Sequence, residues 1–171
     1  MMHRPASDRR ANAAIEFAVI APVVVLLAAG IFTFGTLLRA KAAVNRLAMQ
    51  YAVSFADCSD TTSNGCLTEL NEYATTAAFG NIAPQLSAAS LTLNMAQVKM
   101  NGTTPTLEYA YPSTLSLSAA QKTALQAAVP SGQTGVLVTV TYTYQVQAFS
   151  ALMQPMIGSS VAMSATVTQL K

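Results

Sequence analysis

The longest apolar stretch of the chain runs from Phe17 to Leu38 and contains no charged residue. As an α-helix, its 22 residues would extend about 33 Å, which matches the hydrocarbon core of a bilayer at about 30 Å. The pattern therefore predicts a transmembrane helix, which we place at residues 12–38. Pro22 predicts a kink in this helix, because proline removes one backbone hydrogen bond and neighbouring membrane helices can absorb the freed carbonyl.

A cleaved secretory signal peptide is the alternative interpretation of the same stretch. The arginines that precede it would form the positively charged head of such a peptide. Small residues at Ala28 and Gly30 would then permit cleavage. However, the apolar run continues through residues 31–38, where a mature secreted protein normally becomes polar. The pattern therefore favours a retained span.

The helical pattern continues beyond the span, through residues 39–57, without glycine or proline. Its large apolar residues recur at intervals of three and four, which is typical of one helix face. They are Val44, Leu47, Tyr51 and Phe55. We expect this face to pack on the chain's own domain, in a continuous helix of about 65 Å from Asn12 to Ala56. A seam against another subunit is a compatible second use of that face.

Alternating apolar and polar positions predict three strands in the rest of the chain, residues 58–171. The clearest is residues 135–149, where valines and tyrosines at even positions share one face and threonines at odd positions share the other. Residues 90–100 and 159–170 give the two further strands. Such alternation is typical of an antiparallel sheet with one side on a core. Packed against a long helix, three strands predict an α+β fold.

Two short helices and several connections complete this part of the prediction. The helices are expected at residues 66–80, ended by Gly80, and at residues 116–132, capped by Ser116 or Ser118. The pair Asn101-Gly102 predicts a turn. Residues 103–115, rich in proline, threonine and tyrosine, are predicted to form a loop, and residues 150–158 a connection without regular structure.

Composition and charge narrow the possible functions. Of 171 residues, 52% are hydrophobic and only 9% are charged, against about 25% charged residues in soluble domains. The net charge of +2 is too small to indicate nucleic-acid binding. The basic residues also form no patch, because only Lys99, Lys122 and Lys171 lie beyond position 46. We therefore expect a membrane, and no nucleic acid, as a partner.

Cys58 and Cys66 enclose a short polar segment that contains an Asn-Gly pair. Their spacing favours a disulfide, which would place this part of the chain in an oxidising compartment outside the membrane. Two unpaired thiols are the alternative. A metal site is disfavoured, because neither a histidine nor a third cysteine lies nearby. The arginines and lysines that flank the span are balanced, three on each side, and do not choose an orientation.

Enzymatic chemistry finds little support in the sequence. The only histidine, His3, precedes the span, so a nucleophile–histidine pair is not expected beyond it. The acidic residues beyond the span are best explained as solvated surface groups: Asp57, Asp60, Glu69, Glu72 and Glu108. No glycine-rich phosphate loop occurs. The expectation is a protein that is not an enzyme and binds no cofactor, with a periplasmic enzyme as the weakest alternative.

Glu16 lies at the mouth of the apolar run and has two interpretations. As a carboxylate at the lipid headgroups, beside the positive end of the helix dipole, it would cost little. Alternatively, it becomes buried among neighbouring helices, where an ionised acid costs about 2.5–3.5 kcal/mol and calls for a partner. The natural partner is an α-amino group on an adjacent subunit, which requires a cut between Ala11 and Asn12. The residues alone leave both interpretations open.

Residues 9–52 resemble the N-terminal segment of the TadE-like family of pilus-assembly proteins. These are pseudopilins or minor pilins of the tight-adherence (Flp) branch of type IV pilus systems. The shared elements are Arg9-Arg10, Ala11, Ala13-Ala14, Glu16-Phe17, Pro22 and Phe34-Gly35. Two positions depart from the pattern. Ala11 stands where prepilin-like substrates usually have glycine, and Thr33 stands where an acid often precedes the Phe-Gly pair.

The resemblance implies a pilin-like architecture and a route of maturation. Residues 1–11 would be a cytoplasmic leader, removed after Ala11 by a membrane prepilin peptidase, with Glu16 and Phe17 used in processing and assembly. The span would cross the bacterial inner membrane once, residues 39–57 would extend the helix into the periplasm, and residues 58–171 would form a periplasmic head. Other pilin and pseudopilin subunits and a pilus assembly platform are the implied partners, in a subunit that can enter an extracellular pilus. A membrane-anchored, adhesin-like binding module that never enters a filament is the alternative.

Overall fold

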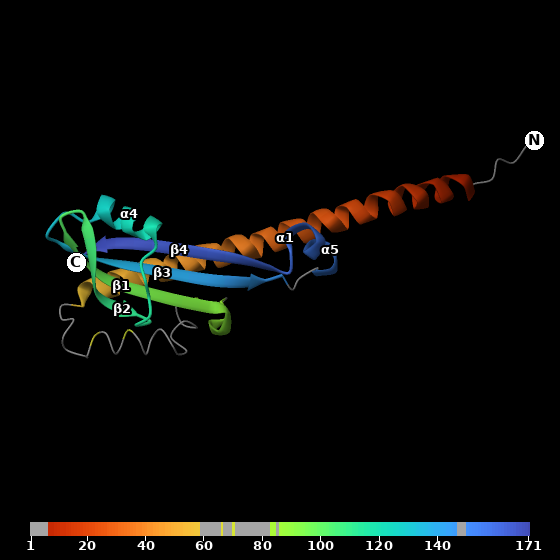
Figure 1. Ribbon diagram of the computed structural model, residues 1–171. Helices are drawn as coiled ribbons and strands as arrows, with labels where there is room; N and C mark the ends of the chain where they lie inside the picture. The colour runs from red at the N-terminus through yellow and green to blue at the C-terminus, as the bar shows by residue number, and fades with distance from the viewer. Residues whose placement is uncertain (1–6, 59–65, 67–69, 71–82, 85, 147–149) are drawn as a thin grey trace, which may run out of the picture. The chain divides into compact units, whose positions relative to one another are not determined.

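The computed structural model describes residues 7–58, 66, 70, 83–84, 86–146 and 150–171 (Figure 1). Its first element is a single helix of 51 residues, α1 (Ser7–Asp57), with Pro22 inside it. The chain divides into two compact units, Met1–Leu37 with Gln145–Val161, and Leu38–Tyr144 with Ala162–Lys171. Helix α1 contributes to both units. The predicted continuity of the helix beyond the apolar run is thus confirmed.

Four strands form one sheet in the order β2-β1-β3-β4. Their bounds are β1 (Leu91–Asn101), β2 (Thr104–Tyr111), β3 (Thr134–Gln145) and β4 (Ser160–Leu170). Strand β1 pairs antiparallel with both β2 and β3. Between β1 and β2, Gly102 adopts a positive φ of 66°, which glycine permits in a tight turn. The predicted turn and the α+β fold class are both confirmed.

Hydrogen bonds show that β3 and β4 also run antiparallel. The backbone N–H of Lys171 donates to the carbonyl of Thr134 at 3.0 Å, and the hydroxyls of Thr139 and Thr166 lie 3.1 Å apart. Residue numbers on β4 thus decrease as those on β3 increase, so the two strands run antiparallel. Each pair of neighbouring strands in the sheet is therefore antiparallel.

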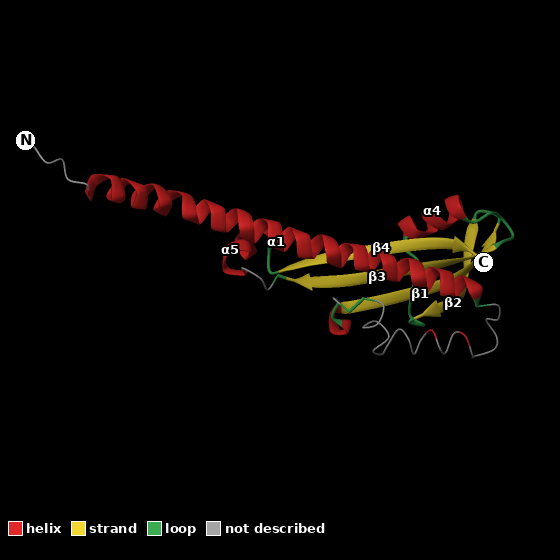
Figure 2. Ribbon diagram, turned by 180° about the vertical axis from the view of Figure 1, so that it is seen from behind, coloured by secondary structure: helices red, strands yellow, loops and turns green. Residues whose placement is uncertain are grey.

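A helix packs on each face of this sheet, so the hydrophobic core has two parts, one between the sheet and each helix. On one face, a buried cluster joins the sheet to α4 (Ala119–Ala128) and the residue after it. Its members are Ala96, Val98, Met100, Leu125, Val129 and Leu137. On the other face, the C-terminal half of α1 crosses the strands (Figure 2). The ring of Phe55 in this half packs against Tyr109, with ring centroids 5.8 Å apart. Four residues of α1 predicted to pack inward are buried: Val44, Leu47, Tyr51 and Phe55.

Helix α4 begins as its sequence indicates. Ser118 is the N-cap, and its hydroxyl accepts a hydrogen bond from the backbone N–H of Gln121 at 3.3 Å. The side chain of Gln121 in turn accepts from the backbone N–H of Ser118 at 2.9 Å, which completes a capping box. Of the two caps predicted, Ser118 is the correct one. The close approach of Val129 to Gly135 of β3 then holds the end of the helix against the sheet.

Two segments differ from the prediction. Residues 103–115, expected as a loop, contain strand β2, so the sheet has four strands rather than three. Strand β2 lies at the edge of the sheet, where Pro105 removes no hydrogen bond that a neighbouring strand requires. Residues 150–158, expected without regular structure, contain α5 (Ser150–Ile157), which tolerates Pro155 and ends at Gly158 with a φ of 83°. The helix expected at residues 66–80 lies largely outside the described residues, of which Cys66 and Leu70 are helical.

Candidate functional site: the apolar N-terminal helix

The first half of α1 leaves its apolar side chains uncovered. The mean hydropathy of its most apolar window is 2.6, and only 11% of that window is buried within the protein. A helix in the core of a soluble protein would be mostly buried instead. The exposed residues of this half include Ile15, Val19, Ile20, Val23, Val24, Leu27, Ile31 and Leu38. By length and composition, this helix could cross a membrane.

The residues predicted for processing and assembly lie at the start of the same helix. The bond between Ala11 and Asn12 falls within the first two turns of α1, which begins at Ser7. Glu16 is exposed, and Phe17 beside it is 73% exposed. Glu16 and Phe17 are thus not covered by the described part of their own chain. Their roles in cleavage and assembly stay predictions.

Pro22 lies inside a continuous helix and is exposed. It lines an apolar groove of about 450 Å³ whose other walls come from α1 and from one residue of α5. The lining residues are Ala18, Ala21, Pro22, Val25, Leu26 and Leu152. Both helices belong to the same compact unit, so this groove is a feature of that unit. The kink at Pro22 stays a prediction.

The hydroxyl groups within the apolar run are satisfied by the helix itself. Thr33 is buried, and its hydroxyl donates to the carbonyl of Ala29 at 2.8 Å. Thr36 donates to the carbonyl of Thr33 at 2.8 Å. Such bonds to the preceding turn allow threonine in an apolar environment without an unpaired polar group. Thr33 therefore adds no charge and no unmet hydrogen bond to the apolar run.

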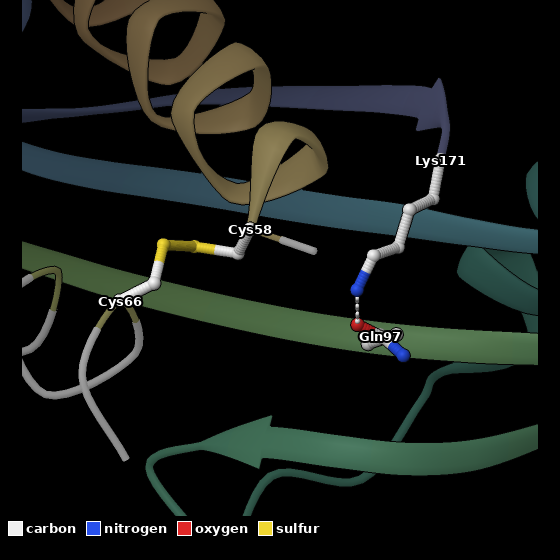
Figure 3. Close-up of a disulfide and its surroundings, with 4 residues drawn as sticks. All are labelled: Cys58, Cys66, Gln97 and Lys171. Atoms are coloured by element: carbon white, nitrogen blue, oxygen red, sulfur yellow. Dashed lines mark hydrogen bonds between the residues drawn. A yellow bond between two sulfur atoms is a disulfide. The ribbon is translucent and has the colours of Figure 1, made fainter. Parts of the chain in front are cut away.

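A disulfide fastens the other end of α1. Cys58 directly follows the helix and is bonded to Cys66, with the two Cα atoms 5.8 Å apart (Figure 3). The N–H of Cys58 also donates to the carbonyl of Phe55 at 3.3 Å, which continues the helical hydrogen bonding by one residue. The predicted disulfide is confirmed. It ties the helix that covers the sheet to the segment that follows.

A buried polar chain beside this disulfide is absent from the sequence prediction. Gln97 is only 4% exposed; its carbonyl oxygen accepts from Nζ of Lys171 at 2.9 Å (Figure 3), and its amide donates to the carboxylate of Glu108 at 2.9 Å. Glu108 reaches Gln97 because the β1–β2 register shifts between Gln97 and Val98. The charge of Lys171 is thus linked through one amide to that of Glu108. Separations of 74 and 11 residues leave no local signal of this arrangement.

Burial also alters one ionisable group on the head side of α1. Loss of hydration raises the pKa of the Tyr51 hydroxyl from 10.0 to about 12. The phenol is therefore neutral at physiological pH and acts as part of the core. Within the part of the chain that the structure describes, no group of three or more histidine, cysteine, aspartate or glutamate side chains is positioned to hold a metal ion.

The fold and this helix together define a class of protein: one apolar N-terminal helix able to cross a membrane, followed by a small α+β head. The family model described as TadE-like protein matches residues 12–52. The predicted resemblance is confirmed for this segment, which is consistent with a TadE-like protein of the tight-adherence pilus system. No curated protein and no solved structure matches the chain.

Proposed function

We propose that the chain is a minor pilin or pseudopilin of a tight-adherence (Flp) type IV pilus, with a structural role. The observation that carries the proposal is the division of one helix into two environments. Residues 39–57 pack one face on the head, whereas the preceding residues of the TadE-like segment leave most of their large apolar side chains bare. A subunit of this kind is held in the inner membrane by the bare half until that half packs among helices of other subunits.

The size of the apolar surface supports the same conclusion. Burying one valine, leucine, isoleucine or phenylalanine side chain contributes about 1.5–3 kcal/mol. Many such side chains are exposed between Ile15 and Leu38, so water is an unsuitable environment for this half of α1. Lipid hydrocarbon and a bundle of similar helices both remove the surface from water. One helix can therefore serve first as a membrane anchor and then as a packing element in a filament.

Glu16 has a role in the second environment but not in the first. At the membrane surface its carboxylate is solvated by headgroups and water. In a bundle of helices, the same carboxylate needs a positive partner, because an isolated charge in hydrocarbon costs about 2.5–3.5 kcal/mol. Cleavage after Ala11 by a prepilin peptidase would create an α-amino group at Asn12, four residues from Glu16. The amine of one subunit then offsets the carboxylate of its neighbour and sets their axial register.

The disulfide supports an orientation with the head outside the cytoplasm. Disulfides persist in the periplasm and are rare in the reducing cytosol. Cys58 follows α1 directly, so the bond between Cys58 and Cys66 supports a periplasmic location for residues 58–171. The N-terminal residues, including the leader 1–11, then lie in the cytoplasm, where a membrane peptidase with a cytoplasmic site can reach them.

The mass of the native N-terminus tests this proposal. We expect protein purified from membranes to begin at Asn12, the first residue of the TadE-like match. An intact leader would favour a membrane-anchored, adhesin-like module that stays out of filaments. A start at Ile31 would favour ordinary secretion and would contradict the anchor.

Filament yield tests the role of Glu16 separately. We expect Glu16→Gln to leave membrane insertion intact and to reduce filament formation strongly, because the neighbouring amine loses its partner. Asp57→Asn is the matched control, since Asp57 is an exposed acid at the opposite end of the same helix. Normal filaments from Glu16→Gln would rule out the proposed charge pairing.

A further inference from the structure

Helix α5 lies beside the part of α1 that is expected to cross the membrane. It belongs to the same compact unit as Met1–Leu37, and Leu152 of α5 lines one groove with Pro22, Val25 and Leu26 of α1. Leu26 precedes Leu38, the end of the uncharged run, by about 18 Å along the helix axis. Half of the hydrocarbon core measures about 15 Å. If α1 crosses the bilayer, α5 therefore lies at the depth of the lipid chains and not above them.

The side chains of α5 suit that depth. Met153 is buried, whereas Leu152 and Met156 are exposed, Met156 by 74%. Leu152 and Met156 are four residues apart, so they share one face of the helix. This face adds exposed apolar side chains to the bare surface of α1 in the same compact unit. No aspartate, glutamate, lysine or arginine occurs anywhere in residues 123–170, so the segment can enter an apolar phase without a charge.

Two backbone hydrogen bonds lie among the described residues that flank or end α5. The N–H of Gly158 donates to the carbonyl of Gln154 at 2.9 Å and ends the helix. The N–H of Val146 donates to the carbonyl of Ser159 at 3.1 Å. This bond joins a residue before α5 to a residue after it. Unpaired backbone groups are not tolerated against hydrocarbon, whereas a paired helical excursion packed on a spanning helix is.

We propose that α5 is a second membrane-contacting element, which enters the hydrocarbon core of the bilayer beside α1 with Leu152 and Met156 among phospholipid acyl chains. The inference rests on the proposed anchoring of α1. Its function is to fix the rotation of α1 before assembly, because α5 shields one side of the spanning helix from lipid. Ala29 and Thr33, both buried, lie on that helix in the same compact unit.

Fluorescence quenching tests this placement, since the chain contains no tryptophan of its own. Three full-length variants are reconstituted at high lipid excess in phosphatidylcholine vesicles: Met156→Trp, Leu27→Trp as the spanning control and Leu107→Trp as the head control. All three replace exposed apolar residues. We expect phosphatidylcholine brominated on its acyl chains to quench Met156→Trp and Leu27→Trp, and aqueous iodide to quench only Leu107→Trp. Formation of the Cys58–Cys66 disulfide verifies folding of each variant.

Each other outcome overturns a specific statement. Quenching of Met156→Trp by iodide and not by brominated lipid would place α5 in water and overturn the inference while the anchor stands. Protection of Met156→Trp from both quenchers would mean that protein, such as a second copy of the chain, covers α5, and would also overturn it. Loss of lipid quenching at Leu27→Trp would contradict the anchoring of α1, and thereby the proposed function itself.

Discussion

The two halves of α1 share one uninterrupted backbone but present opposite surfaces. Between Ile15 and Leu38, most large apolar side chains are exposed around the helix. The run from Phe17 to Leu38 also contains no charged residue that would favour contact with water. From Arg39 onward, charged residues return and one buried face packs on the sheet. An uninterrupted helix therefore does not indicate whether each of its halves is surrounded by protein, lipid or water. The distribution of apolar residues around the axis decides which half is core and which half is anchor.

The largest effect is expected from removing a ring on the packed half. Phe55→Ala should lower the free energy of unfolding of the head by about 3–5 kcal/mol, because Phe55 is fully buried against Tyr109. Phe34→Ala removes the same ring from the anchor half, where Phe34 is 54% exposed. This control should leave head stability unchanged. Denaturant unfolding in mild detergent measures both, and equal losses would abolish the distinction between the halves.

A charge in the anchor half should have the next largest effect. Val24→Arg places a guanidinium near the middle of the apolar run and should disfavour membrane insertion by about 2.5–3.5 kcal/mol. Met49→Arg introduces the same group at an exposed position of the packed half and should insert normally. The fraction of protein that resists alkaline extraction from membranes is the readout. Full retention of Val24→Arg would show that this half does not lie in hydrocarbon.

Loss of the disulfide should weaken the packed half alone. Replacing both Cys58 and Cys66 by serine should reduce head stability by about 2–3 kcal/mol, since the bond closes a loop with a sequence separation of 8. Membrane insertion should be unaffected, because the anchor half lies at the other end of α1. Unfolding of the parent protein with and without reductant provides the matched comparison. An insertion defect in the double serine variant would mean that the two halves are coupled.

The sequence predicted the parts of this molecule whose signals are local. The uncharged run, the inward face through Val44 and Leu47, and the alternation in β3 each follow from residues a few positions apart. Strand β2 was missed because Pro105 argues against a strand, and only its edge position in the assembled sheet removes that objection. Helix α5 was missed because eight residues with an internal Pro155 fall below the length at which helical periodicity is recognisable.

The candidate site likewise contains some residues that local sequence signals predicted and others that they did not. Glu16, Phe17 and Pro22 stand out because a charge, a motif and a helix breaker interrupt or border the apolar run. The groove between α1 and Leu152 could not be predicted, since more than a hundred residues separate its walls. The link from Lys171 through Gln97 to Glu108 depends on strand register and on a bulge, neither of which the local pattern encodes. Contacts between distant segments thus account for what was missed.

The smallest effect concerns titration of the packed half. Burial raises the pKa of Tyr51 from 10.0 to about 12, so the folded protein disfavours the phenolate relative to the unfolded chain. The corresponding stability is fully present below pH 10 and is lost as the pH rises towards 12, because the unfolded state releases its proton first. We therefore expect the free energy of unfolding of the parent protein to fall more steeply over this range than that of Tyr51→Phe, which cannot ionise.

The difference between the two proteins isolates Tyr51, since they are identical at every other position. Denaturant unfolding at several values between about pH 9 and pH 12 measures it. Identical slopes would mean that the Tyr51 hydroxyl is as hydrated in the folded head as in the unfolded chain. That result would contradict close packing of α1 on the sheet at this turn, and with it the contrast between a covered and a bare half of the same helix.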